Sequence, residues 1–467
     1  MKILFIYPNI VESPKDFSTG LATLAAVCKK QGHQTSLIDS TFGISEPEIL
    51  NKAKRFSPDL IAITTATNDF DYACKIASLL KQNFKSPIIA GGFHPTIAPE
   101  EVISKDCFDI VCVGEGEKAL IALIKSLEQG KINTKIKNLW FKKTNKKGKL
   151  IIIKNPLGAL IQDLDNLPFP DRELFNYDKY LNWNHKTLSV ISTRGCPYQC
   201  SYCLNHLLTK MYEGKGKYVR FRSIDNIFTE IKQALDMYGE NIKNIEFYDD
   251  TFTLDEKRIN EFCKRYPKEI GIPFNINARV NAVNPKLLKS LKKAGCVRVS
   301  IGVEAGDSKI RNNILKRNMT DEQIINTFKS ARQAGLKTYS FNMIGLPFET
   351  KQTIKKTIEL NRKCQPDFVG VSIFNAFKGT EIYDLCKKNN LLKQNYSKSY
   401  FRESNIKNPN FTQAELKRIR NSFGFRVFLT YKPLRAIADL IDRNLSQINS
   451  YIFIRSKIIE KMKLIRK

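Results

Sequence analysis

The first part of the chain alternates short apolar runs with segments of helical periodicity. Each run is bounded by polar or Gly-rich residues and is too short for a buried helix, which is typical of buried parallel strands. Helical patterns such as residues 20–31 and 69–84 lie between the runs. The repeated strand–helix order predicts an open, doubly wound α/β sheet of Rossmann or flavodoxin type. The runs are residues 2–8, 34–39, 60–65, 87–92 and 109–114.

A second strand–helix series begins at Leu188 and contains six further apolar runs. Helical patterns such as residues 224–238 and 321–334 separate several of them. A series of this kind predicts a partial (βα)6 barrel, TIM-like, with functional residues at the carboxyl ends of its strands. The runs are LSVISTRG, KNIEFYDD, FNINAR, VRVSIGVEAG, TYSFNMIGLP and FVGVSIFNAF.

These patterns divide the chain of 467 residues into four regions, as expected for a length at which a single core stops growing. Residues 1–140 are predicted to form the Rossmann-like domain, and residues 188–390 the partial barrel. Residues 141–187 are irregular and contain the stretch LPFPD, so we interpret them as a linker. Residues 391–467 are basic and are predicted to form a helical C-terminal region.

The chain is strongly basic, with a formal net charge of +30. Such an excess attracts anionic partners, whether nucleic acid, acidic lipid or phosphorylated substrate, without choosing between them. The last segment, YIFIRSKIIEKMKLIRK, combines aliphatic, aromatic and basic residues. This composition predicts a basic amphipathic helix, which either makes a peripheral membrane contact or packs on its own domain.

The start of the chain, MKILFIYPNI, suits a buried first strand better than an export signal, so we expect a cytoplasmic protein. A membrane-spanning helix is not expected, because no uninterrupted apolar run reaches about 18 residues. Eight of the eleven cysteines are dispersed, mostly in apolar stretches. Isolated cysteines of this kind commonly behave as small buried hydrophobic residues.

The other three cysteines lie within eight residues, in the segment ISTRGCPYQCSYC. Cys196, Cys200 and Cys203 follow a predicted strand at the spacing C-x3-C-x2-C. Three thiolates on one tight loop can ligate three irons of a [4Fe–4S] cubane cluster and leave the fourth iron open to a substrate. The alternative is a structural zinc site, in which His206 would complete a Cys3His set.

Polar and Gly-rich residues also follow three strands of the first series. Ligands of open parallel sheets bind beyond the carboxyl ends of the strands, where glycine lets the backbone approach closely. We therefore expect a ligand at this edge of the front sheet. The candidate contacts are Thr65, Gly91, Gly92, His94, Gly114 and Glu115.

The cysteine segment, with Tyr202 as the aromatic residue of C-x3-C-x-aromatic-C, resembles the signature of the radical S-adenosylmethionine superfamily. In that family the open iron binds S-adenosylmethionine, and an electron from the cluster cleaves it to give a 5′-deoxyadenosyl radical. The resemblance implies cofactor contacts from Tyr202 and, at later strand ends, from Asp250, Arg279 and Glu304. Arg317 lies where relatives often carry a basic residue, and we expect it to be a surface charge.

The segment GGFHPTIAPEE, followed by DIVCVGEGE, is similar to the cobalamin-binding domain that precedes the barrel in a large branch of this superfamily. That branch includes methyltransferases acting on carbon or phosphorus and some cyclases. The resemblance implies that cobalamin is the ligand at the front-domain strand ends. The mutase pattern Asp-x-His-x-x-Gly is absent, so we expect His94 to structure its loop rather than to ligate cobalt.

Together the resemblances favour a cobalamin-dependent radical methyltransferase that acts on an unactivated carbon of a small or lipid-like metabolite. Such an enzyme takes electrons from an external donor such as flavodoxin or ferredoxin. One alternative is a radical cyclase or oxidoreductase of the anaerobic tetrapyrrole type. Others are a radical enzyme that modifies tRNA and a basic RNA-binding protein with a structural cluster. The front domain lacks the further cluster cysteines of the tRNA-modifying methylthiotransferases, so nucleic acid is not expected as a partner.

Overall fold

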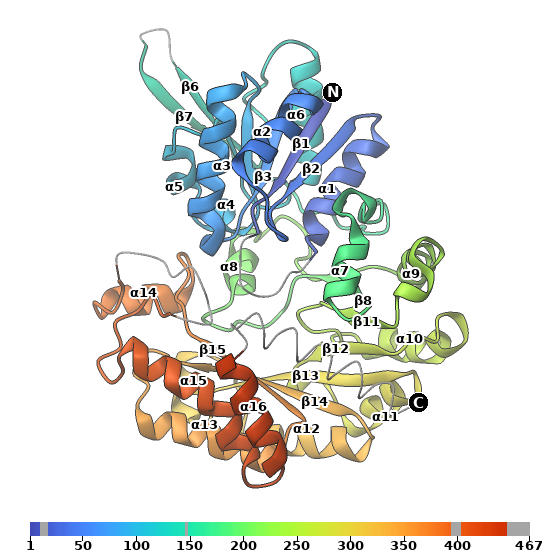
Figure 1. Cartoon of the computed structure of the whole chain (residues 1–467), viewed down its shortest axis with the longest axis vertical. Helices are drawn as coiled ribbons and strands as arrows, with labels where there is room; N and C mark the ends of the chain where they lie inside the picture. Colours follow the sequence, from blue (N-terminus) through green and yellow to red (C-terminus); the bar gives the residue numbers. More distant parts are fainter. Residues whose placement is uncertain (10–16, 145–147, 394–402, 446–467) are drawn as a thin grey trace.

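The computed structural model describes residues 1–9, 17–144, 148–393 and 403–445. Two α/β domains lie one above the other, with the N-terminal front domain at the top of Figure 1 and the barrel domain below it. Helix α8 lies between them, and the C-terminal helices α15 and α16 flank the barrel domain. The arrangement confirms a Rossmann-like domain, a partial barrel and a helical C-terminal region.

Seven strands form the sheet of the front domain, in the order β2-β1-β3-β4-β5-β6-β7. The first five pair in parallel, whereas β6 and β7 are added antiparallel at one edge. This sheet therefore continues past residue 140. The bounds are β1 Lys2–Tyr7, β2 Gln34–Asp39, β3 Leu60–Thr64, β4 Ile88–Gly91, β5 Ile110–Cys112, β6 Leu139–Thr144 and β7 Leu150–Lys154.

Helices cover both faces of this sheet, because alternate residues of a strand point to opposite sides. Ile3 and Phe5 of β1 pack with residues of α1 and α6, whereas Leu4 and Ile6 pack with residues of α2, α3 and α5. The doubly wound prediction is thus confirmed. The bounds are α1 Thr19–Lys30, α2 Glu46–Phe56, α3 Phe70–Asn83, α4 Phe93–Ile97, α5 Pro99–Ser104 and α6 Glu117–Glu128.

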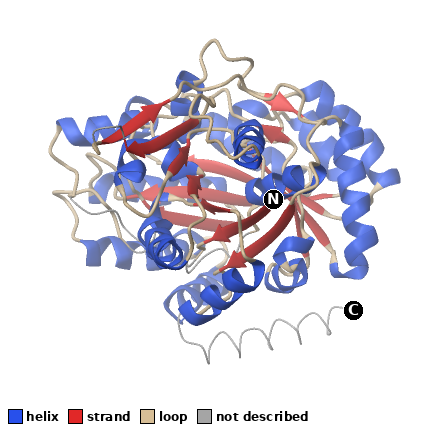
Figure 2. Ribbon diagram, turned by 90° about the horizontal axis from the view of Figure 1, so that it is seen from above, coloured by secondary structure: helices blue, strands red, loops and turns tan. Residues whose placement is uncertain are grey.

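The barrel domain is an open sheet of six parallel strands in the order β15-β14-β13-β12-β11-β8. Figure 2 shows the strands of the molecule surrounded by helices. The strands are β8 Thr187–Val190, β11 Asn244–Phe247, β12 Phe274–Ala278, β13 Cys296–Glu304, β14 Lys337–Ile344 and β15 Phe368–Ile373. The helices are α9 Ile224–Tyr238, α10 Glu256–Glu269, α11 Pro285–Lys293, α12 Asp321–Gln333 and α13 Lys351–Cys364.

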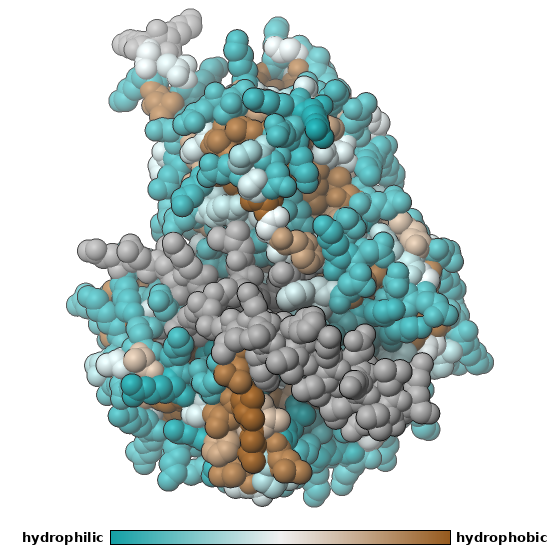
Figure 3. All heavy atoms as spheres, viewed as in Figure 1, coloured by the Kyte–Doolittle hydropathy of each residue, from teal (hydrophilic) through white to brown (hydrophobic). Residues whose placement is uncertain are grey.

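Three more helices follow the last strand: α14 Glu381–Lys388, α15 Gln413–Phe428 and α16 Pro433–Leu445. Leu416 and Phe423 of α15 pack in one buried cluster with Val369 of β15. Figure 3 shows an apolar surface patch over α16, at the lower centre of the view. The helix predicted within residues 451–467 lies outside the described residues. Among the helices that the structure describes, none is both long enough and apolar enough to cross a bilayer.

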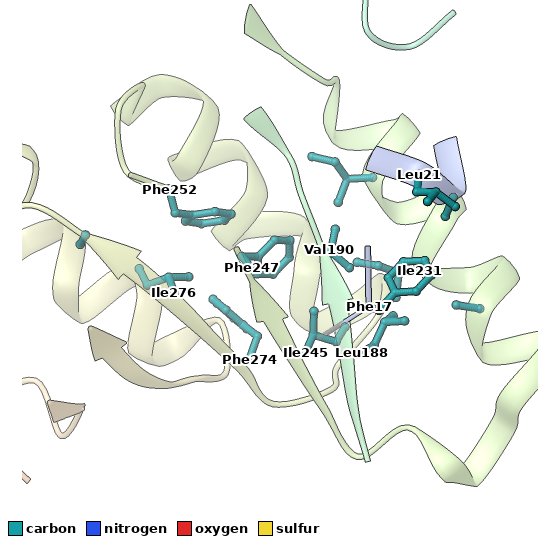
Figure 4. Packing of buried hydrophobic residues seen from close by; sticks show 14 of the residues in the cluster. Phe17, Leu21, Leu188, Val190, Ile231, Ile245, Phe247, Phe252, Phe274 and Ile276 are labelled. Carbon is teal, nitrogen blue, oxygen red and sulfur yellow. The ribbon is translucent and has the colours of Figure 1, made fainter. Parts of the chain in front are cut away.

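The segment predicted as a linker packs into the core that joins the two domains. It contains a 3-10 turn, Glu173–Phe175, and helix α7, Tyr177–Trp183. The ring of Tyr177 lies edge-on to that of Phe17 of the front domain, with centroids 5.0 Å apart. Figure 4 shows Phe17 beside Leu188 of the barrel domain. One continuous hydrophobic core therefore runs through both domains.

A buried ion network ties this segment to the barrel domain. Glu230 of α9 is 1% exposed, and its carboxylate accepts hydrogen bonds from Arg172 and Arg222. Burial alone would raise the pKa of Glu230, but the two guanidinium groups lower that pKa below its usual value. The network is therefore fully charged at neutral pH, and each partner depends on the others for its burial.

We expect Glu230→Gln to lower the free energy of unfolding by about 3–5 kcal/mol, because it leaves two buried guanidinium groups without a counter-charge. The lowered pKa adds stability above the usual carboxyl pKa, and this stability is lost as the pH falls through the lowered value. Urea denaturation across this range measures both effects. Glu240→Gln is the control, because Glu240 is exposed and pairs only with nearby Lys243; an equal loss there would contradict the prediction.

Candidate active site between the two domains

The three clustered cysteines lie on one loop between β9 (Thr193–Arg194) and α8 (Leu204–Met211). This loop follows the carboxyl end of β8. Cys196 and Cys200 are buried, and Cys203 is partly buried. Burial raises the pKa of the Cys203 thiol to about 11. The structure therefore brings the three sulfur atoms to the strand-end edge of the barrel, where the sequence pattern placed them.

Contacts from the end of β11 and from the turn after the π-helix Ile310–Ile314 fix this loop. Asp249 follows β11 and accepts hydrogen bonds from the backbone nitrogen atoms of Ser192 (2.8 Å) and Thr193 (2.5 Å). Farther along, the backbone nitrogen of Ser201 donates to the carbonyl oxygen of Leu315 (3.2 Å). Asp249 is 1% exposed, so water does not compete for these hydrogen bonds. Its carboxylate thus holds the entry to the loop and belongs to the scaffold of the site.

Two buried guanidinium groups lie against the sulfur of Cys200. Nη1 of Arg279, just after β12, is 3.1 Å from Sγ, and Nη1 of Arg317 is 3.8 Å from it. The Arg279 guanidinium also stacks on the ring of Tyr198, 4.0 Å from its centroid. Hydrogen-bond donors and positive charge beside a sulfur stabilise negative charge on it, including that of a metal-bound thiolate.

The expectation that Arg317 is a surface charge is wrong. Its side chain is 8% exposed, and Nη1 lies 3.0 Å from the hydroxyl of Tyr202 and 3.8 Å from Oε1 of Glu304. Burial alone would lower the pKa of Arg317, but Tyr202 and Glu304 hold that pKa above its usual value. Arg317 follows a π-helix, Ile310–Ile314, and no sequence motif marks a turn of that kind as buried.

Glu304 ends β13 in a left-handed backbone conformation, with φ of 63°. Its carboxylate reaches back over Gly302, where an added Cβ would come within 2.3 Å of Oε1 and 2.8 Å of Nη2 of Arg317. Glycine at 302 is therefore required for this approach. Burial raises the pKa of Glu304, although Arg317 opposes the shift. Tyr202, Arg279 and Glu304, which the sequence pattern singled out separately, thus meet around Cys200.

Asp250 lies on the other side of the cysteine loop. Its Oδ2 accepts a hydrogen bond from Nδ2 of Asn205 (3.0 Å), whose amide oxygen accepts one from the hydroxyl of Tyr218 (2.8 Å). The same Nδ2 lies 3.7 Å from the sulfur of Cys203. Burial raises the pKa of Asp250. This chain of contacts links the second strand end to the cysteine loop through neutral groups.

A cavity of about 790 Å³ separates the strand ends of the two domains. Front-domain strand ends and the ends of β8 and β11 line it, together with Gly195 and Leu204 on either side of the cysteine segment. Ligands of parallel sheets bind at such strand ends. Predicted residues in its wall are Thr65, Gly91, Gly92, Gly114, Glu115 and Asp250, and apolar ones include Leu160, Leu164, Leu167, Phe169 and Leu208.

His94 lies behind this wall. Its ring packs on that of Phe70 with centroids 4.2 Å apart, and Nδ1 lies 3.2 Å from Oγ1 of Thr67. Burial lowers the pKa of His94 to about 4, so the ring is neutral at pH 7. These are the contacts of a residue that structures its loop. The preceding residue, Phe93, lines the cavity instead and is 61% exposed.

The glycines at the front-domain strand ends make room for close packing. An added Cβ at Gly114 would lie 1.9 Å from the hydroxyl of Tyr212, which follows α8. Gly92 has φ of 100°, and a Cβ there would lie 2.8 Å from Oγ1 of Thr64. A side chain at either position would collide with Tyr212 or Thr64. Close packing within the chain therefore requires glycine at both positions, whether or not a ligand is bound.

Glu115 forms a polar contact between the two domains, a role that the sequence pattern did not suggest. Oε1 accepts hydrogen bonds from Nη1 of Arg220 (2.7 Å) and Nη1 of Arg194 (3.2 Å). Nη2 of Arg194 also pairs with Glu117 at 2.7 Å. Arg194 is two residues before Cys196 and Arg220 begins β10 (Arg220–Phe221). The front-domain loop is thereby fastened to the strand that leads into the cysteine loop.

The donor set around the loop suits an iron–sulfur cluster better than a single zinc ion. His206 does not point to the cysteines, because its Nε2 lies 3.7 Å from Oε2 of Glu381 on α14. Three thiols on a shielded loop, with cationic donors at one sulfur, fit a cubane.

Comparison with known proteins agrees with this geometry. The Radical SAM superfamily model matches residues 190–360, and the B12 binding domain model matches residues 17–124. An uncharacterized methyltransferase of Pyrococcus horikoshii is 30% identical over 95% of both chains. The anaerobic magnesium-protoporphyrin IX monomethyl ester cyclase of Rubrivivax gelatinosus is 24% identical, over 82% of this chain and 69% of the relative. Cytidylyl-2-hydroxyethylphosphonate methyltransferase of Streptomyces wedmorensis is 23% identical, over 74% and 73%.

Solved structures share the whole arrangement of domains. The cobalamin-dependent S-adenosylmethionine radical enzyme OxsB, with aqua-cobalamin and S-adenosylmethionine bound, superposes with a TM-score of 0.73 at 16% identity. The match covers 99% of this chain and 75% of OxsB. The radical methyltransferase TsrM of Kitasatospora setae gives a TM-score of 0.68 at 16% identity, over 84% of this chain and 77% of TsrM.

Removal of either guanidinium at Cys200 is expected to make the reduction potential of a reconstituted cluster more negative. Reduction adds negative charge to the cluster, and a cationic donor at a ligand sulfur stabilises the reduced form. The variants are Arg279→Gln and Arg317→Gln, compared at equal iron and sulfide content by potentiometric titration followed by EPR. Arg298→Gln is the control, because Arg298 pairs with Glu246 near the amino end of β13. Potentials that match the wild type would contradict the prediction.

Proposed function

This chain belongs to the branch of the radical S-adenosylmethionine superfamily that carries a B12 binding domain, and we propose that it is a methyltransferase acting on an unactivated carbon. The observation that carries the proposal is the shared cavity, because Gly195 and Leu204, which flank the cysteine segment, line it together with the front-domain strand ends. The [4Fe–4S] cluster with S-adenosylmethionine supplies a carbon-centred oxidant when bound, and cobalamin supplies a transferable methyl group.

Different residues of this chain would hold the cluster, S-adenosylmethionine and the corrin. Cys196, Cys200 and Cys203 would hold three irons of the cluster on a loop that Asp249 fixes. Arg317 orients Tyr202 and Glu304 beside it, at the strand ends where the resemblance places S-adenosylmethionine. Thr65, Gly91, Gly92, Gly114 and Glu115 form the edge of the front sheet that holds the corrin, and His94 supports that edge from behind.

The apolar part of the cavity wall indicates the polarity of the substrate that the cavity can bind. Leucine and phenylalanine side chains from the segment between the domains form this side, together with Leu208 of α8. A wall of this kind excludes water and offers few hydrogen-bond partners, which protects a reactive radical from side reactions. It favours a small substrate with a large apolar part, including a lipid-like one.

The electron that starts the reaction comes from an external donor such as flavodoxin or ferredoxin in the cytoplasm. A net charge of +30 favours acidic partners of this kind, because opposite charges accelerate their encounter. We also propose a peripheral membrane contact that involves the basic C-terminal segment.

A radical cyclase or oxidoreductase is the second candidate. The relative from Rubrivivax gelatinosus supports it, because a cyclase there matches most of this chain. The two reactions leave different products. Methyl transfer adds one methyl group to the substrate and forms S-adenosylhomocysteine besides 5′-deoxyadenosine, whereas cyclisation leaves the carbon count of the substrate unchanged.

The test begins with anaerobic purification, cluster reconstitution and addition of cobalamin. We expect iron, sulfide and corrin to bind, and S-adenosylmethionine labelled in its methyl group to yield 5′-deoxyadenosine and S-adenosylhomocysteine under a reductant. Cys200→Ala should abolish 5′-deoxyadenosine formation, because it removes one ligand of the cluster. Cell extract supplies candidate substrates, and label in an extracted product identifies methyl transfer. Turnover to 5′-deoxyadenosine without any labelled product or S-adenosylhomocysteine would contradict methyl transfer and favour the cyclase.

The variant Gly92→Ala distinguishes binding of the corrin from binding of the iron–sulfur cluster. The added Cβ meets Oγ1 of Thr64 at 2.8 Å in a backbone conformation that only glycine adopts freely, so the front-domain edge is displaced. We expect the bound corrin to fall while iron content stays at the wild-type value, as measured by absorbance and metal analysis. Gly130→Ala is the matched control, since Gly130 also has positive φ but nothing within 4 Å of its Cβ position. Equal corrin content in both variants would contradict a corrin site at this edge.

A further inference from the structure

Helix α16 packs with its polar side inward and its apolar side outward. Leu434, Ile437 and Ile441 are 84%, 52% and 44% exposed, whereas Ala436 is fully buried. At 3.6 residues per turn, the three exposed aliphatic residues lie within about 60° of arc on one face of the helix. We call this set the α16 apolar face, and it coincides with the patch visible in Figure 3.

Polar contacts on the inward side of α16 hold the helix in this orientation. Oδ2 of Asp439 pairs with Nε of Arg443 at 2.7 Å, and Asp439 packs so closely on Gly424 of α15 that no Cβ fits there. Nη2 of Arg443 donates to the carbonyl oxygen of Val369 at 2.6 Å. Polar groups and the buried Ala436 therefore hold the helix on α15 and β15, whereas Leu434, Ile437 and Ile441 stay on the exposed side.

The helix pair that carries this face, α15 and α16, is basic. Residues 413–445 carry seven Lys or Arg and three Asp or Glu, a net charge of +4. The guanidinium of Arg435, next to Leu434, lies over the ring of Phe368, 4.6 Å from its centroid. The chain then continues through residues 446–467, which add six basic residues, one acidic residue and many aliphatic ones, a further +5.

We propose that the α16 apolar face, with the basic residues around it, is a docking surface for an anionic lipid bilayer. Aliphatic side chains enter the headgroup boundary while Lys and Arg are attracted to acidic headgroups. A second copy of this chain fits less well, because an isologous contact would bring together two helix pairs that each carry a net charge of +4 over residues 413–445. The basic C-terminal segment is disfavoured as a cover for the same reason.

The proposal extends the peripheral membrane contact proposed above to described residues of α15 and α16. Stable attachment of a protein to a membrane requires two signals, such as an apolar anchor together with a polybasic stretch. The α16 apolar face supplies the first signal, and the basic residues of 413–445 supply the second. Attachment is therefore expected to be reversible and sensitive to salt.

Vesicle flotation of the full chain tests this surface. The test variant replaces the α16 apolar face, Leu434→Gln, Ile437→Gln and Ile441→Gln, and keeps good helix formers at exposed positions. The control variant, Leu150→Thr, Ile151→Thr and Ile152→Thr, removes three exposed aliphatic residues from the edge strand β7. The vesicles contain phosphatidylcholine alone or phosphatidylcholine with phosphatidylglycerol.

We expect the wild type to float with the anionic vesicles and not with phosphatidylcholine alone. The α16 variant should lose about tenfold or more of its partitioning because the apolar anchor is removed, whereas the β7 variant stays within about twofold of the wild type. High salt should release the wild type.

Three results would overturn the proposal. The first is equal flotation of the α16 variant and the wild type, and the second is a loss confined to the β7 variant. The third is a wild type that ignores vesicles but forms a dimer, seen by light scattering, that the α16 variant does not form. Formation of 5′-deoxyadenosine without vesicles should be equal in the α16 variant and the wild type, so failure of the membrane contact and failure of the proposed reaction are distinguished.

Discussion

Glu115 accepts hydrogen bonds from Arg194 and Arg220, and this contact fixes how far the front sheet stands from the cysteine loop. The two parallel sheets present their carboxyl ends to each other, and each edge alone would be an open, solvent-filled rim. The carboxylate and its two guanidinium partners close one side of that rim, while the buried core around Phe17 and Tyr177 closes another. A shared cavity is possible only because both contacts hold the sheets at one separation.

Much of this arrangement follows from patterns that the sequence displays openly. Strands buried on both faces leave continuous apolar runs, so both sheets and their order along the chain could be predicted. Because the carboxyl ends of parallel strands share an edge, residues such as Thr65, Gly92 and Asp250 could be assigned to a cavity without any knowledge of distances. The tight spacing of Cys196, Cys200 and Cys203 required only that one loop carry all three.

Other parts of the site depend on contacts that no local pattern encodes. Arg317 reaches Cys200 from a turn after a π-helix, and its charge in the sequence is indistinguishable from that of a solvated arginine. The chain between the domains has too few periodic residues to predict a core, yet Tyr177 packs tightly there. In α16 the periodicity of Leu434, Ile437 and Ile441 predicts a buried face. In the structure Asp439, paired with Arg443, packs against α15 instead, and the three aliphatic side chains are exposed.

The close approach of Tyr212 to Gly114 joins two parts of the molecule that are separate in sequence. Tyr212 follows the helix that begins directly after Cys203, and its hydroxyl accepts a hydrogen bond from the backbone nitrogen of Glu115. The front-domain loop cannot open without releasing this tyrosine, and the tyrosine cannot move far without drawing on the helix behind the cysteines. The strand-end edge of the front domain and the helix after the cysteine loop therefore share one contact, through which a displacement of either is passed to the other.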